Sequence, residues 1–356
     1  MKRLNLAVIG QGRSGKDIHG AFYRSEGNTF FNVRYVVDAD EISRQRALEL
    51  YPGCEALSDY RELFEKNDLD LVVNASYSCM HYPITKDLLE HGLNVLVEKP
   101  FARNRYECED LIRTAKAHGV TLAVFQQTFL APFYLEAQRF IQSGVFGHIE
   151  QINIHYSGYF RRWDWQTMQK MMGGSTYNTG PHPIGLALGF LDFDPLTTVV
   201  YSRLATALTS GDADDYSKIL LTAPGKPLVD VEMNTIDPFN NYQLQIMGTR
   251  GALRATNAHY ELQYWKEEEN PPRPVQLETL RDENHNPIYC SEKLVWHKES
   301  GDFKGSVFTS AVKAFYENLY AALTEGAPLA VPPEKVTEIV GVIEKVHADN
   351  PLPVKY

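Results

Sequence analysis

The sequence lacks the long apolar runs, paired cysteines and basic excess that would indicate a membrane, zinc or nucleic acid. A segment needs about 18 consecutive apolar residues to cross a bilayer, and none of its apolar runs is that long. Its 35 Lys and Arg are outnumbered by 45 Asp and Glu, and the formal net charge of −10 argues against nucleic acid or an anionic membrane as the main partner. Neither a C-x-x-C pair nor zinc spacing occurs among the four cysteines, Cys54, Cys79, Cys108 and Cys290. We therefore expect reduced thiols in a cytoplasmic protein, and no metal site.

A glycine-rich turn follows the first apolar run of the chain. Residues 4–9 predict a buried strand, and Gly10-Gln11-Gly12-Arg13-Ser14-Gly15 follows with G-x-G-x-x-G spacing before a helix predicted over 16–24. In such a turn the first glycine permits the bend, the second lets the backbone approach a pyrophosphate, and the third lets the helix pack on the sheet. Free N–H groups and the positive dipole end of the helix attract phosphate. The turn therefore predicts a dinucleotide site, with an ordinary strand–turn–helix connection as the alternative. The candidate contacts are Gly10, Gly12, Arg13, Ser14 and Gly15.

An acidic residue closes the second predicted strand. Asp38 follows residues 33–37 and can accept hydrogen bonds from both ribose hydroxyls of NAD, whereas its charge repels the extra phosphate of NADP. We therefore expect NAD as the cofactor. Arg44 and Arg46 lie one or two helical turns further on and leave NADP open. The alternative role for Asp38 is to cap the following helix.

The pattern of the chain changes near residue 125. Before it, short apolar runs alternate with helical patterns, which is typical of βαβ units and a parallel sheet. Beyond it, period-two alternation predicts a mainly antiparallel sheet with helices over one face, then two closing helices over 306–324 and 333–347. The strands predicted are 4–9, 33–37, 69–73, 94–97 and 120–124 in the first part, and 149–160, 197–205, 216–222, 228–236, 242–247, 252–255 and 261–265 in the second. Residues 266–286, rich in charge and proline, predict an exposed loop.

The predicted fold class is therefore α/β, in two domains. Residues 1–125 form a Rossmann dinucleotide-binding domain. Residues 126–356 form an α+β domain with a large, mainly antiparallel, open-faced sheet, which we expect to bind the substrate and to mediate oligomerisation.

Glu98-Lys99-Pro100 follows directly after the predicted strand 94–97. Ligands of open α/β sheets bind at the carboxyl ends of the strands, so Lys99 stands where a nicotinamide ring and a substrate would meet. A lysine there can hydrogen-bond a substrate hydroxyl or carbonyl and stabilise the negative charge that develops during hydride transfer. The alternative is a surface lysine, with Pro100 ending the strand pairing.

A glycine-rich segment, residues 173–182, precedes an apolar helix predicted over 184–191. Asn178 and His182 are four residues apart, and both can face a cleft at the mouth of that helix. An imidazole in that position can take a hydroxyl proton near neutral pH. The alternatives are that Asn178 or Thr179 caps the helix and that His182 packs beneath it.

Together these motifs resemble the glucose–fructose oxidoreductase/inositol dehydrogenase/rhizopine-catabolism (Gfo/Idh/MocA) family of NAD(P)-dependent dehydrogenases, over nearly the whole chain. Besides the glycine turn, the matching elements are Asn74-Ala75-Ser76 after the third predicted strand, His81 at the start of the next helix, Val97-Glu98-Lys99-Pro100, and the Gly-Gly…Gly-Pro-His segment. The resemblance implies that Lys99 and His182 are catalytic and that Asn178 stands at a third catalytic position. It also implies a set of cofactor contacts, namely Ser76, Tyr77, His81, Glu98 and Lys99.

The sequence departs from the family pattern in three places. Asn178 stands where the family usually has an aspartate, and an amide can orient a group but cannot accept a proton, which leaves His182 as the candidate base. Tyr77 replaces a proline beside the nicotinamide, so we expect an altered pocket wall. Gln126 and Gln127 stand where the family often has an asparagine beside a basic residue, and Gln127 is a candidate substrate contact.

An aromatic and basic cluster precedes the glycine-rich segment. Aromatic faces suit the apolar C–H side of a sugar ring, and arginines suit hydroxyls or a carboxylate. The candidates for substrate binding here are Tyr159, Arg161, Trp163 and Trp165, together with Asn178. The alternative is that the tryptophans anchor the two domains to each other.

The predicted function is that of an NAD(P)-dependent dehydrogenase, which oxidises a secondary hydroxyl of a sugar, glycoside or cyclitol with NAD, or with NADP as the alternative. In this reaction His182 removes the hydroxyl proton, Lys99 orients the oxygen and stabilises its charge, and Asn178 holds the substrate or His182. We expect a small-molecule carbohydrate or polyol substrate and a homodimer or homotetramer, with no nucleic acid or membrane as partner. Two alternatives remain: redox-assisted glycoside cleavage with a recycled NAD, and a catalytically silent NAD(P)-binding regulator.

Overall fold

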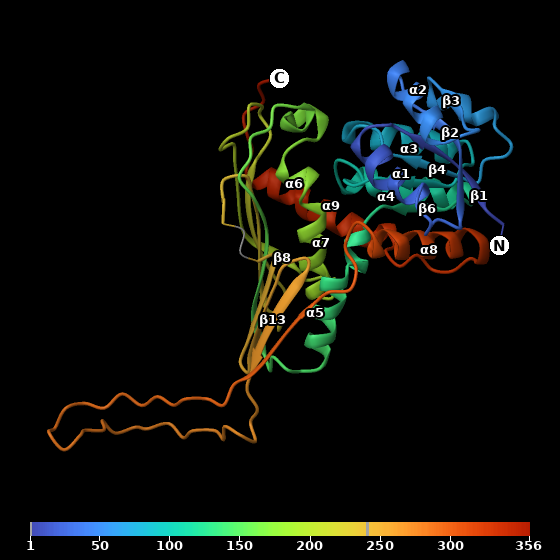
Figure 1. The fold of residues 1–356 in the computed structure, drawn as a ribbon. Helices are drawn as coiled ribbons and strands as arrows, with labels where there is room; N and C mark the ends of the chain where they lie inside the picture. The colour runs from blue at the N-terminus through green and yellow to red at the C-terminus, as the bar shows by residue number, and fades with distance from the viewer. Residues whose placement is uncertain (1, 240–241) are drawn as a thin grey trace.

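A six-stranded parallel sheet organises the first domain. In the computed structural model, which describes residues 2–239 and 242–356, its strand order is β3-β2-β1-β4-β5-β6 (Figure 1). The strands are β1 Leu4–Ile9, β2 Phe31–Val37, β3 Glu55–Leu57, β4 Leu71–Asn74, β5 Val95–Val97 and β6 Leu122–Val124. Leu6 and Val8 enter the core on one face, whereas Ala7 and Ile9 enter the core on the other. This doubly covered parallel sheet confirms the Rossmann domain.

Helices cover both faces of this sheet. They are α1 Gly20–Tyr23, α2 Glu41–Leu50, α3 His81–Glu90 and α4 Arg105–His118, with short 3₁₀ turns at Tyr60–Glu65 and Ser78–Met80. The helix predicted over 16–24 begins earlier, because Arg13–His19 is wound as a π-helix that continues into α1. The hydrogen bond from the N–H of Gly20 to the carbonyl of Gly15 spans five residues and accounts for the wider turn.

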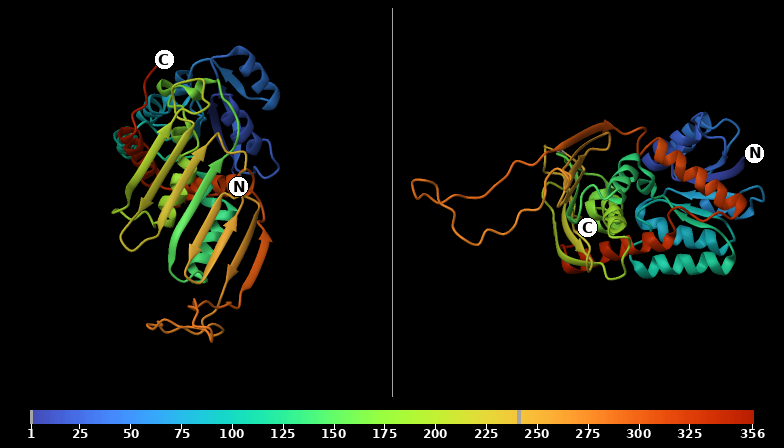
Figure 2. Two further views of the ribbon diagram at one scale, coloured as in Figure 1. Left: turned by 90° about the vertical axis from the view of Figure 1, so that its left-hand side faces the viewer. Right: turned by 90° about the horizontal axis from the view of Figure 1, so that it is seen from below.

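An eight-stranded sheet organises the second domain. Its order is β14-β13-β12-β11-β7-β10-β9-β8, and neighbours are antiparallel except for the parallel pair β7 and β10. The strands are β7 Ile149–Ser157, β8 Thr198–Ala205, β9 Tyr216–Thr222, β10 Leu228–Asn234, β11 Leu244–Gly248, β12 Gly251–Ala255, β13 His259–Tyr264 and β14 His297–Asp302. Figure 2 shows that no helix of the described part of the chain covers the outer face of this sheet, which confirms the open-faced sheet.

Helices and short turns cover the inner face of this second sheet, opposite its open face. They are α5 Pro132–Gln142, α6 Ser175–Asn178 and α7 Pro181–Phe190, with 3₁₀ turns at Gln127–Leu130, Trp165–Thr167 and Gln169–Met171. Proline occupies the first turn of both α5 and α7, where its missing N–H is not needed.

The last two helices tie the domains together. Although α8 (Ser310–Glu325) follows the predicted division of the chain, it returns to the first sheet, where Phe315 and Tyr316 join the core of β1. The other helix, α9 (Pro333–Asp349), lies along both domains: Arg105 of α4 forms an ion pair with Glu338, and Asn350 just beyond α9 bonds to β8. The cleft between the domains is thereby held from one side.

Between β13 and β14 the chain forms a long exposed arm, which extends away from the body of the protein (Figures 1 and 2). It contains the predicted loop 266–286 and continues to residue 296. All four cysteines are free thiols. Over residues 2–239 and 242–356, no helix is long and apolar enough to cross a membrane, and no group of three metal-ligating side chains occurs.

Candidate active site

The glycine turn lies at the carboxyl end of β1 and needs glycine at two positions for packing. Gly10 has φ of +86°, and a Cβ there would collide with the backbone carbonyl of Ala75. A Cβ on Gly15 would collide with the carbonyl oxygen of Gly10. At Gly12, by contrast, no atom of the described residues other than its two chain neighbours lies within 4 Å of the position that a Cβ would take. The open space over Gly12 fits the close approach of a pyrophosphate.

The first turn of the π-helix faces this open space. Arg13 and Ser14 lie in that turn, and the flanking Gly12 has no side chain with which to cap it. Its leading N–H groups are thus left to bind an anionic ligand. The residues present therefore fit a dinucleotide.

Asp38 lies directly after β2, with its carboxylate turned toward the glycine turn. Oδ2 accepts a hydrogen bond from the N–H of Gln11 at 2.7 Å, and Oδ1 accepts one from the N–H of Asp40 at 2.9 Å. The alternative cap role for Asp38 is wrong, because Asp40 caps α2 by accepting from the N–H of Ser43 at 2.8 Å. Each oxygen of Asp38 retains a lone pair with which to bind a ribose hydroxyl.

The loop after β4 carries Ser76 and Tyr77, and α3 begins at His81 as predicted. The hydroxyl of Ser76 donates to Oδ1 of Asn74 at 2.7 Å. His81 is 2% exposed, and its ring nitrogens lie 2.7 Å from the carbonyl of Pro100 and 3.2 Å from that of Ser76. Burial lowers the pKa of His81. His81 thus ties the loop after β4 to the loop after β5.

Glu98 lies in a buried network beneath the candidate lysine. Its Oε1 is 3.1 Å from Nε2 of His19, whose Nδ1 is 2.6 Å from the hydroxyl of Tyr316. The hydroxyl of Tyr23 also contacts that of Tyr316. The network joins the π-helix, β5 and α8, and it holds the Glu98 anion against the N–H of Lys99 at 3.0 Å.

Lys99 reaches from the first domain to the second. Its Nζ donates to the carbonyl of Asn178 at 2.9 Å, and the Lys99–Pro100 peptide is cis. Burial lowers the pKa of Lys99, the charge of Glu98 opposes that shift, and Arg13 and Arg162 reinforce it. The alternative of a free surface lysine is wrong, since a surface side chain would not be desolvated and bonded across the domain boundary.

His182 lies in the first turn of α7, near Lys99. Its Nδ1 is 2.6 Å from the hydroxyl of Thr128, which belongs to the 3₁₀ turn Gln127–Leu130. Burial, with the charge of Lys99, lowers the pKa of His182 to about 3. The imidazole is therefore neutral at physiological pH and remains partly exposed to solvent.

Asn178 is the last residue of α6 and lies between the other two candidates. Its carbonyl holds Lys99, and its Oδ1 accepts from Nε2 of Gln166 at 3.2 Å. The alternative that Asn178 or Thr179 caps α7 is wrong, because the cap position is Gly180 and no side chain bonds there. Lys99, Asn178 and His182 thus meet at one place in the cleft.

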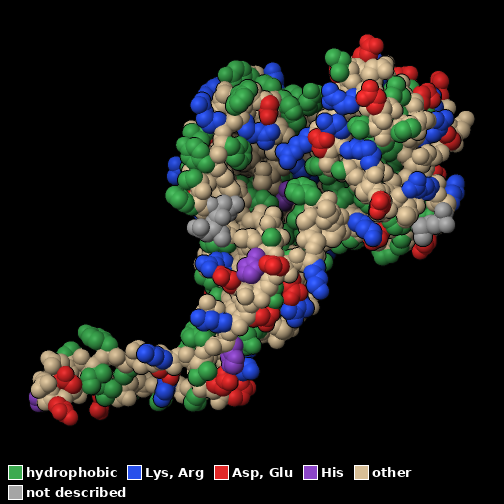
Figure 3. Space-filling view, viewed as in Figure 1, with side chains coloured by type: hydrophobic (Ala, Val, Ile, Leu, Met, Phe, Trp, Pro, Cys, Tyr) green, Lys and Arg blue, Asp and Glu red, His purple; other side chains and the backbone are tan. Residues whose placement is uncertain are grey.

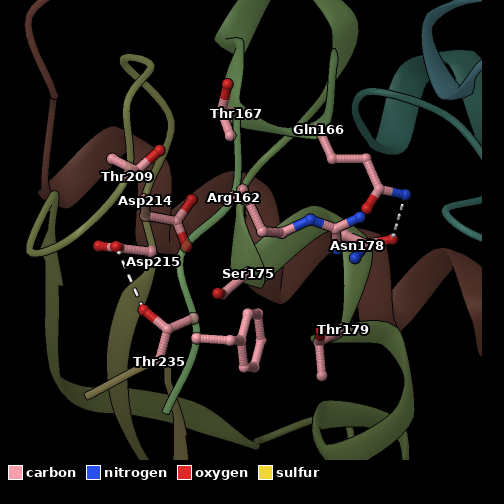
Figure 4. A pocket seen from close by; sticks show the side chains of 12 residues that line it. Arg162, Gln166, Thr167, Ser175, Asn178, Thr179, Thr209, Asp214, Asp215 and Thr235 are labelled. Carbon is pink, nitrogen blue, oxygen red and sulfur yellow. Dashed lines mark hydrogen bonds between the residues drawn. The ribbon is translucent and has the colours of Figure 1, made fainter. Parts of the chain in front are cut away.

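A cavity with about 390 Å³ of empty volume, part of it open to solvent, is lined on one side by Asn178 (Figure 4). The side chains that line it are almost all polar, and they are contributed by Phe160, Arg162, Gln166, Thr167, Ser175, Asn178, Thr179, Thr209, Asp214, Asp215 and Thr235, with Gly174. Hydroxyl, amide and charged groups in this density suit a polyhydroxylated ligand.

The predicted substrate residues only partly coincide with this lining. Tyr159, Arg161 and Trp163 are exposed, Trp163 to 83%, and none lines the cavity. Beyond β7 the chain still alternates, because Tyr159 pairs with Ile236, so Phe160 and Arg162 face the cavity in their place.

The two other predicted contacts lie at the domain boundary. Trp165 packs edge-on against Tyr77, with ring centroids 5.1 Å apart, which bears out the anchoring alternative for this tryptophan. Gln127 is 3% exposed and starts the 3₁₀ turn that carries Thr128.

Sequence comparison covers both domains. Residues 4–126 match the family described as "Oxidoreductase family, NAD-binding Rossmann fold", and residues 134–254 match the "GFO/IDH/MocA C-terminal domain". The chain belongs to the Gfo/Idh/MocA family. It is therefore an oxidoreductase, and its cofactor is a nicotinamide dinucleotide.

Relatives of this Gfo/Idh/MocA oxidoreductase carry several names. An uncharacterized oxidoreductase of Schizosaccharomyces pombe is 24% identical over 71% of each chain. The 2,7-anhydro-N-acetylneuraminate hydratase of Mediterraneibacter gnavus is 26% identical over 71% of this chain and 67% of its own. The scyllo-inositol 2-dehydrogenase (NADP(+)) of Bacillus subtilis is 23% identical over 69% of this chain and 66% of its own. Two further uncharacterized oxidoreductases are matched over only 52% and 45% of their lengths.

Solved structures share the fold over almost the whole chain. An NAD-binding protein from Listeria innocua aligns with a TM-score of 0.79 at 20% identity, over 98% of each chain. The WlbA dehydrogenase from Bordetella pertussis, in complex with NADH and UDP-GlcNAcA, aligns with a TM-score of 0.75 at 16% identity, over 98% of this chain and 96% of its own.

Sequence reasoning missed three residues of the site in this Gfo/Idh/MocA oxidoreductase. Thr128 contacts His182 from a position adjacent to the predicted Gln127, and Arg162 lies adjacent to the predicted Arg161. Asp214 reaches the cavity from the segment just before β9, and no local pattern marks it. Only the register of each segment against its neighbours decides which residue faces the cleft.

Proposed function

We propose that this Gfo/Idh/MocA oxidoreductase oxidises a secondary hydroxyl of a sugar, glycoside or cyclitol at Lys99 and His182. The observation that carries the proposal is the bond from Lys99 Nζ to the carbonyl of Asn178, at 2.9 Å, which brings Lys99 of one domain beside His182 of the other. The relative named scyllo-inositol 2-dehydrogenase supports a polyol substrate, and the WlbA complex with UDP-GlcNAcA supports a sugar.

Lys99 provides the charge at the reacting oxygen. A protonated Nζ donates a hydrogen bond to the substrate hydroxyl and stabilises the negative charge that develops on that oxygen. Partial burial strengthens this interaction, because the surrounding dielectric is low. Glu98 beneath it counteracts the effect of burial on the pKa of Lys99, and so favours the protonated form.

His182 provides the acceptor for the hydroxyl proton. Its pKa of about 3 leaves the ring neutral, so one nitrogen is free to accept. For Nε2 to accept, Nδ1 must carry the ring hydrogen and donate to the hydroxyl of Thr128, which the distance of 2.6 Å allows. Negative charge on the substrate oxygen then raises the proton affinity of the imidazole.

The residues around the glycine turn would hold the cofactor. Gly12, Arg13 and Ser14 would bind the pyrophosphate, Asp38 the adenosine ribose, and the loop of Ser76 and Tyr77 the nicotinamide side. A nicotinamide held there would supply the acceptor for the hydride. We propose NAD over NADP, because Asp38 faces the ribose site.

Arg44 lies beside Asp38 and keeps NADP as the alternative. Its Nη1 donates to the backbone carbonyls of Asp38 and Ala39, at 2.7 and 2.8 Å, so that nitrogen is already engaged by the protein. We further propose that the protein is a cytoplasmic homodimer or homotetramer, on the basis of its free thiols and its helix-free sheet face.

A redox-neutral reaction with a recycled cofactor is the second candidate. The relative named 2,7-anhydro-N-acetylneuraminate hydratase favours it, because that name denotes a reaction with no net oxidation. In such an enzyme the same lysine and histidine would act on the substrate, but NADH would not accumulate.

The test is NADH or NADPH formation across inositols, free hexoses, glycosides and sugar acids, with both cofactors run side by side. Turnover of any member with net reduction supports the dehydrogenase. Product release without net reduction supports the redox-neutral candidate. Tight NAD binding with neither outcome would contradict both and leave the silent regulator.

A further inference from the structure

Arg162 reaches into the cavity from the segment that follows β7. Its side chain is 34% exposed, and Figure 4 shows it extending toward Gln166 and Asn178. Nε and Nη2 donate to one oxygen of Asp164, at 3.2 and 2.9 Å, which leaves Nη1 for another acceptor. Asp164 is itself about half exposed, and an ion pair of that kind is weak. Among the described residues that line the cavity, Arg162 is the only cation.

The carboxylates on the opposite wall are engaged with the protein. Oδ1 of Asp215 accepts from the N–H of Ala207, and Oδ2 accepts from the N–H of Leu208 and the hydroxyl of Thr235. Figure 4 shows Asp215 at that wall, with its hydrogen bond to Thr235 dashed. Asp215 therefore does not lie against the guanidinium of Arg162.

Asp214 on the same wall is engaged through one oxygen only. Oδ2 accepts from the N–H and the hydroxyl of Thr176, at 2.8 and 2.7 Å, whereas Oδ1 is buried without a hydrogen-bond partner. Burial raises the pKa of Asp214. The cavity thus has a cationic end at Arg162 and a hydrogen-bonding end at Asp214.

Positive charge converges on the place where Lys99 meets the second domain. Arg13 and Arg162 both lower the pKa of Lys99, so the three cations lie within electrostatic reach of one another. Figure 3 shows further Lys and Arg side chains around the hollow between the two lobes, although the chain carries a net charge of −10. A bound pyrophosphate would account for Arg13, which lies in the glycine turn. Arg162 belongs to the other domain and needs a separate partner.

We propose that the substrate carries a carboxylate or phosphate group, which Arg162 binds at the cationic end of the cavity, while its hydroxyls face Asn178 and Asp214. The planar guanidinium matches the geometry of either oxyanion. A neutral sugar would leave Arg162 half-buried with only its weak partner. That the ligand is a sugar rests on the proposed function. That the ligand carries an anionic group does not, because it is argued from Arg162 alone.

The experiment is calorimetric titration of the NADH-loaded protein with D-glucuronate, D-gluconate, D-glucose 6-phosphate and D-glucose. Arg162→Gln removes the charge in the cavity, and Arg161→Gln removes an adjacent charge outside it. We expect at least one anionic sugar to bind about tenfold or more tightly than glucose, with the advantage lost in R162Q and kept in R161Q. Tighter binding of D-glucuronate or D-gluconate indicates a carboxylate site, and tighter binding of D-glucose 6-phosphate indicates a phosphate site.

Three results would overturn the proposal: equal binding of glucose and the acids, no binding of any acid, or equal effects of R161Q and R162Q. If R162Q weakens NADH binding instead, Arg162 belongs to the cofactor site and the proposal also fails. Because the readout is binding, it is independent of turnover. A protein that binds the acids but reduces no NAD with any substrate would refute the dehydrogenase and retain the anion site.

Discussion

Replacing Glu98 by glutamine tests how much the buried anion beside Lys99 stabilises the fold. The carboxylate is 3% exposed, lies 3.1 Å from Nε2 of His19, and accepts from the N–H of Lys99 at 3.0 Å. Burial alone would raise the pKa of Glu98, but the contact with His19 and the neighbouring charges lower it from the ordinary 4.5 to about 2. At about 1.4 kcal/mol for each tenfold change in proton affinity, this stabilises the fold by about 3 kcal/mol at neutral pH.

The sign of the pH dependence follows from the direction of that shift. Because the pKa of Glu98 is lower in the folded state, its contribution is fully present above its unfolded value of 4.5 and is lost as the pH falls toward about 2. We expect Glu98→Gln to lower the free energy of unfolding by about 3 kcal/mol at neutral pH, and to flatten its pH dependence between about pH 5 and 3. Urea titrations at neutral pH and at about pH 3 measure this change in the free energy of unfolding. The control is Glu90→Gln, at an exposed position. A Glu98 variant as stable as the parent protein would refute the reasoning.

The remaining predictions concern the cofactor and the pH profile. Gly12→Ala should weaken NADH binding about tenfold or more at an unchanged melting temperature, whereas Gly15→Ala should lower the melting temperature. Fluorescence titration measures the binding, and calorimetry measures the melting temperature. Equal melting temperatures of the two variants would contradict the assigned packing of the glycine turn. With a pKa of about 3, His182 should leave kcat/KM flat between about pH 5 and 8, while the lowered pKa of Lys99 should bring the alkaline loss of activity below its ordinary 10.5. An acidic midpoint near the ordinary histidine value of 6.5 would contradict the assignment. Asp38→Ser should reduce the preference for NAD over NADP, measured as the ratio of kcat/KM values, by about tenfold or more.

The Rossmann domain was predictable because its signals are local. The glycine turn, the strand that ends at Asp38 and the Glu98-Lys99-Pro100 segment each follow from a short run of sequence, and the structure places all three at the carboxyl edge of one sheet. The turn residue Gly12 is the clearest case, since among the described residues no atom beyond its chain neighbours would meet a Cβ there. A glycine at this position fits the close approach of a ligand.

Two strands and one helix placement were not predictable. β3, Glu55–Leu57, is too short to show a period. β14, His297–Asp302, is a polar edge strand that alternates no apolar residues, so only its backbone pairing with β13 defines it. The return of α8 to the first sheet depends on Tyr316 meeting His19 across almost the whole chain, and no local pattern encodes that contact.

In the candidate site, residue types were predicted better than orientations. The sequence identified Lys99, Asn178 and His182, and the structure brings them together. It favoured Arg161 where the structure directs Arg162 into the cavity. The residue that faces the cleft is set by how the segment after β7 pairs with its neighbour, which composition does not reveal.

The central claim is that Lys99 acts on the reacting oxygen and not on cofactor affinity. The most direct test is Lys99→Met, with kcat measured on the best substrate of the panel and NADH binding measured by fluorescence, and with the exposed Lys170→Met as the matched control. We predict that kcat falls by about a thousandfold while NADH affinity stays within about twofold, and that the control changes neither. Retained turnover, or loss of turnover that is fully explained by loss of NADH binding, would contradict the account.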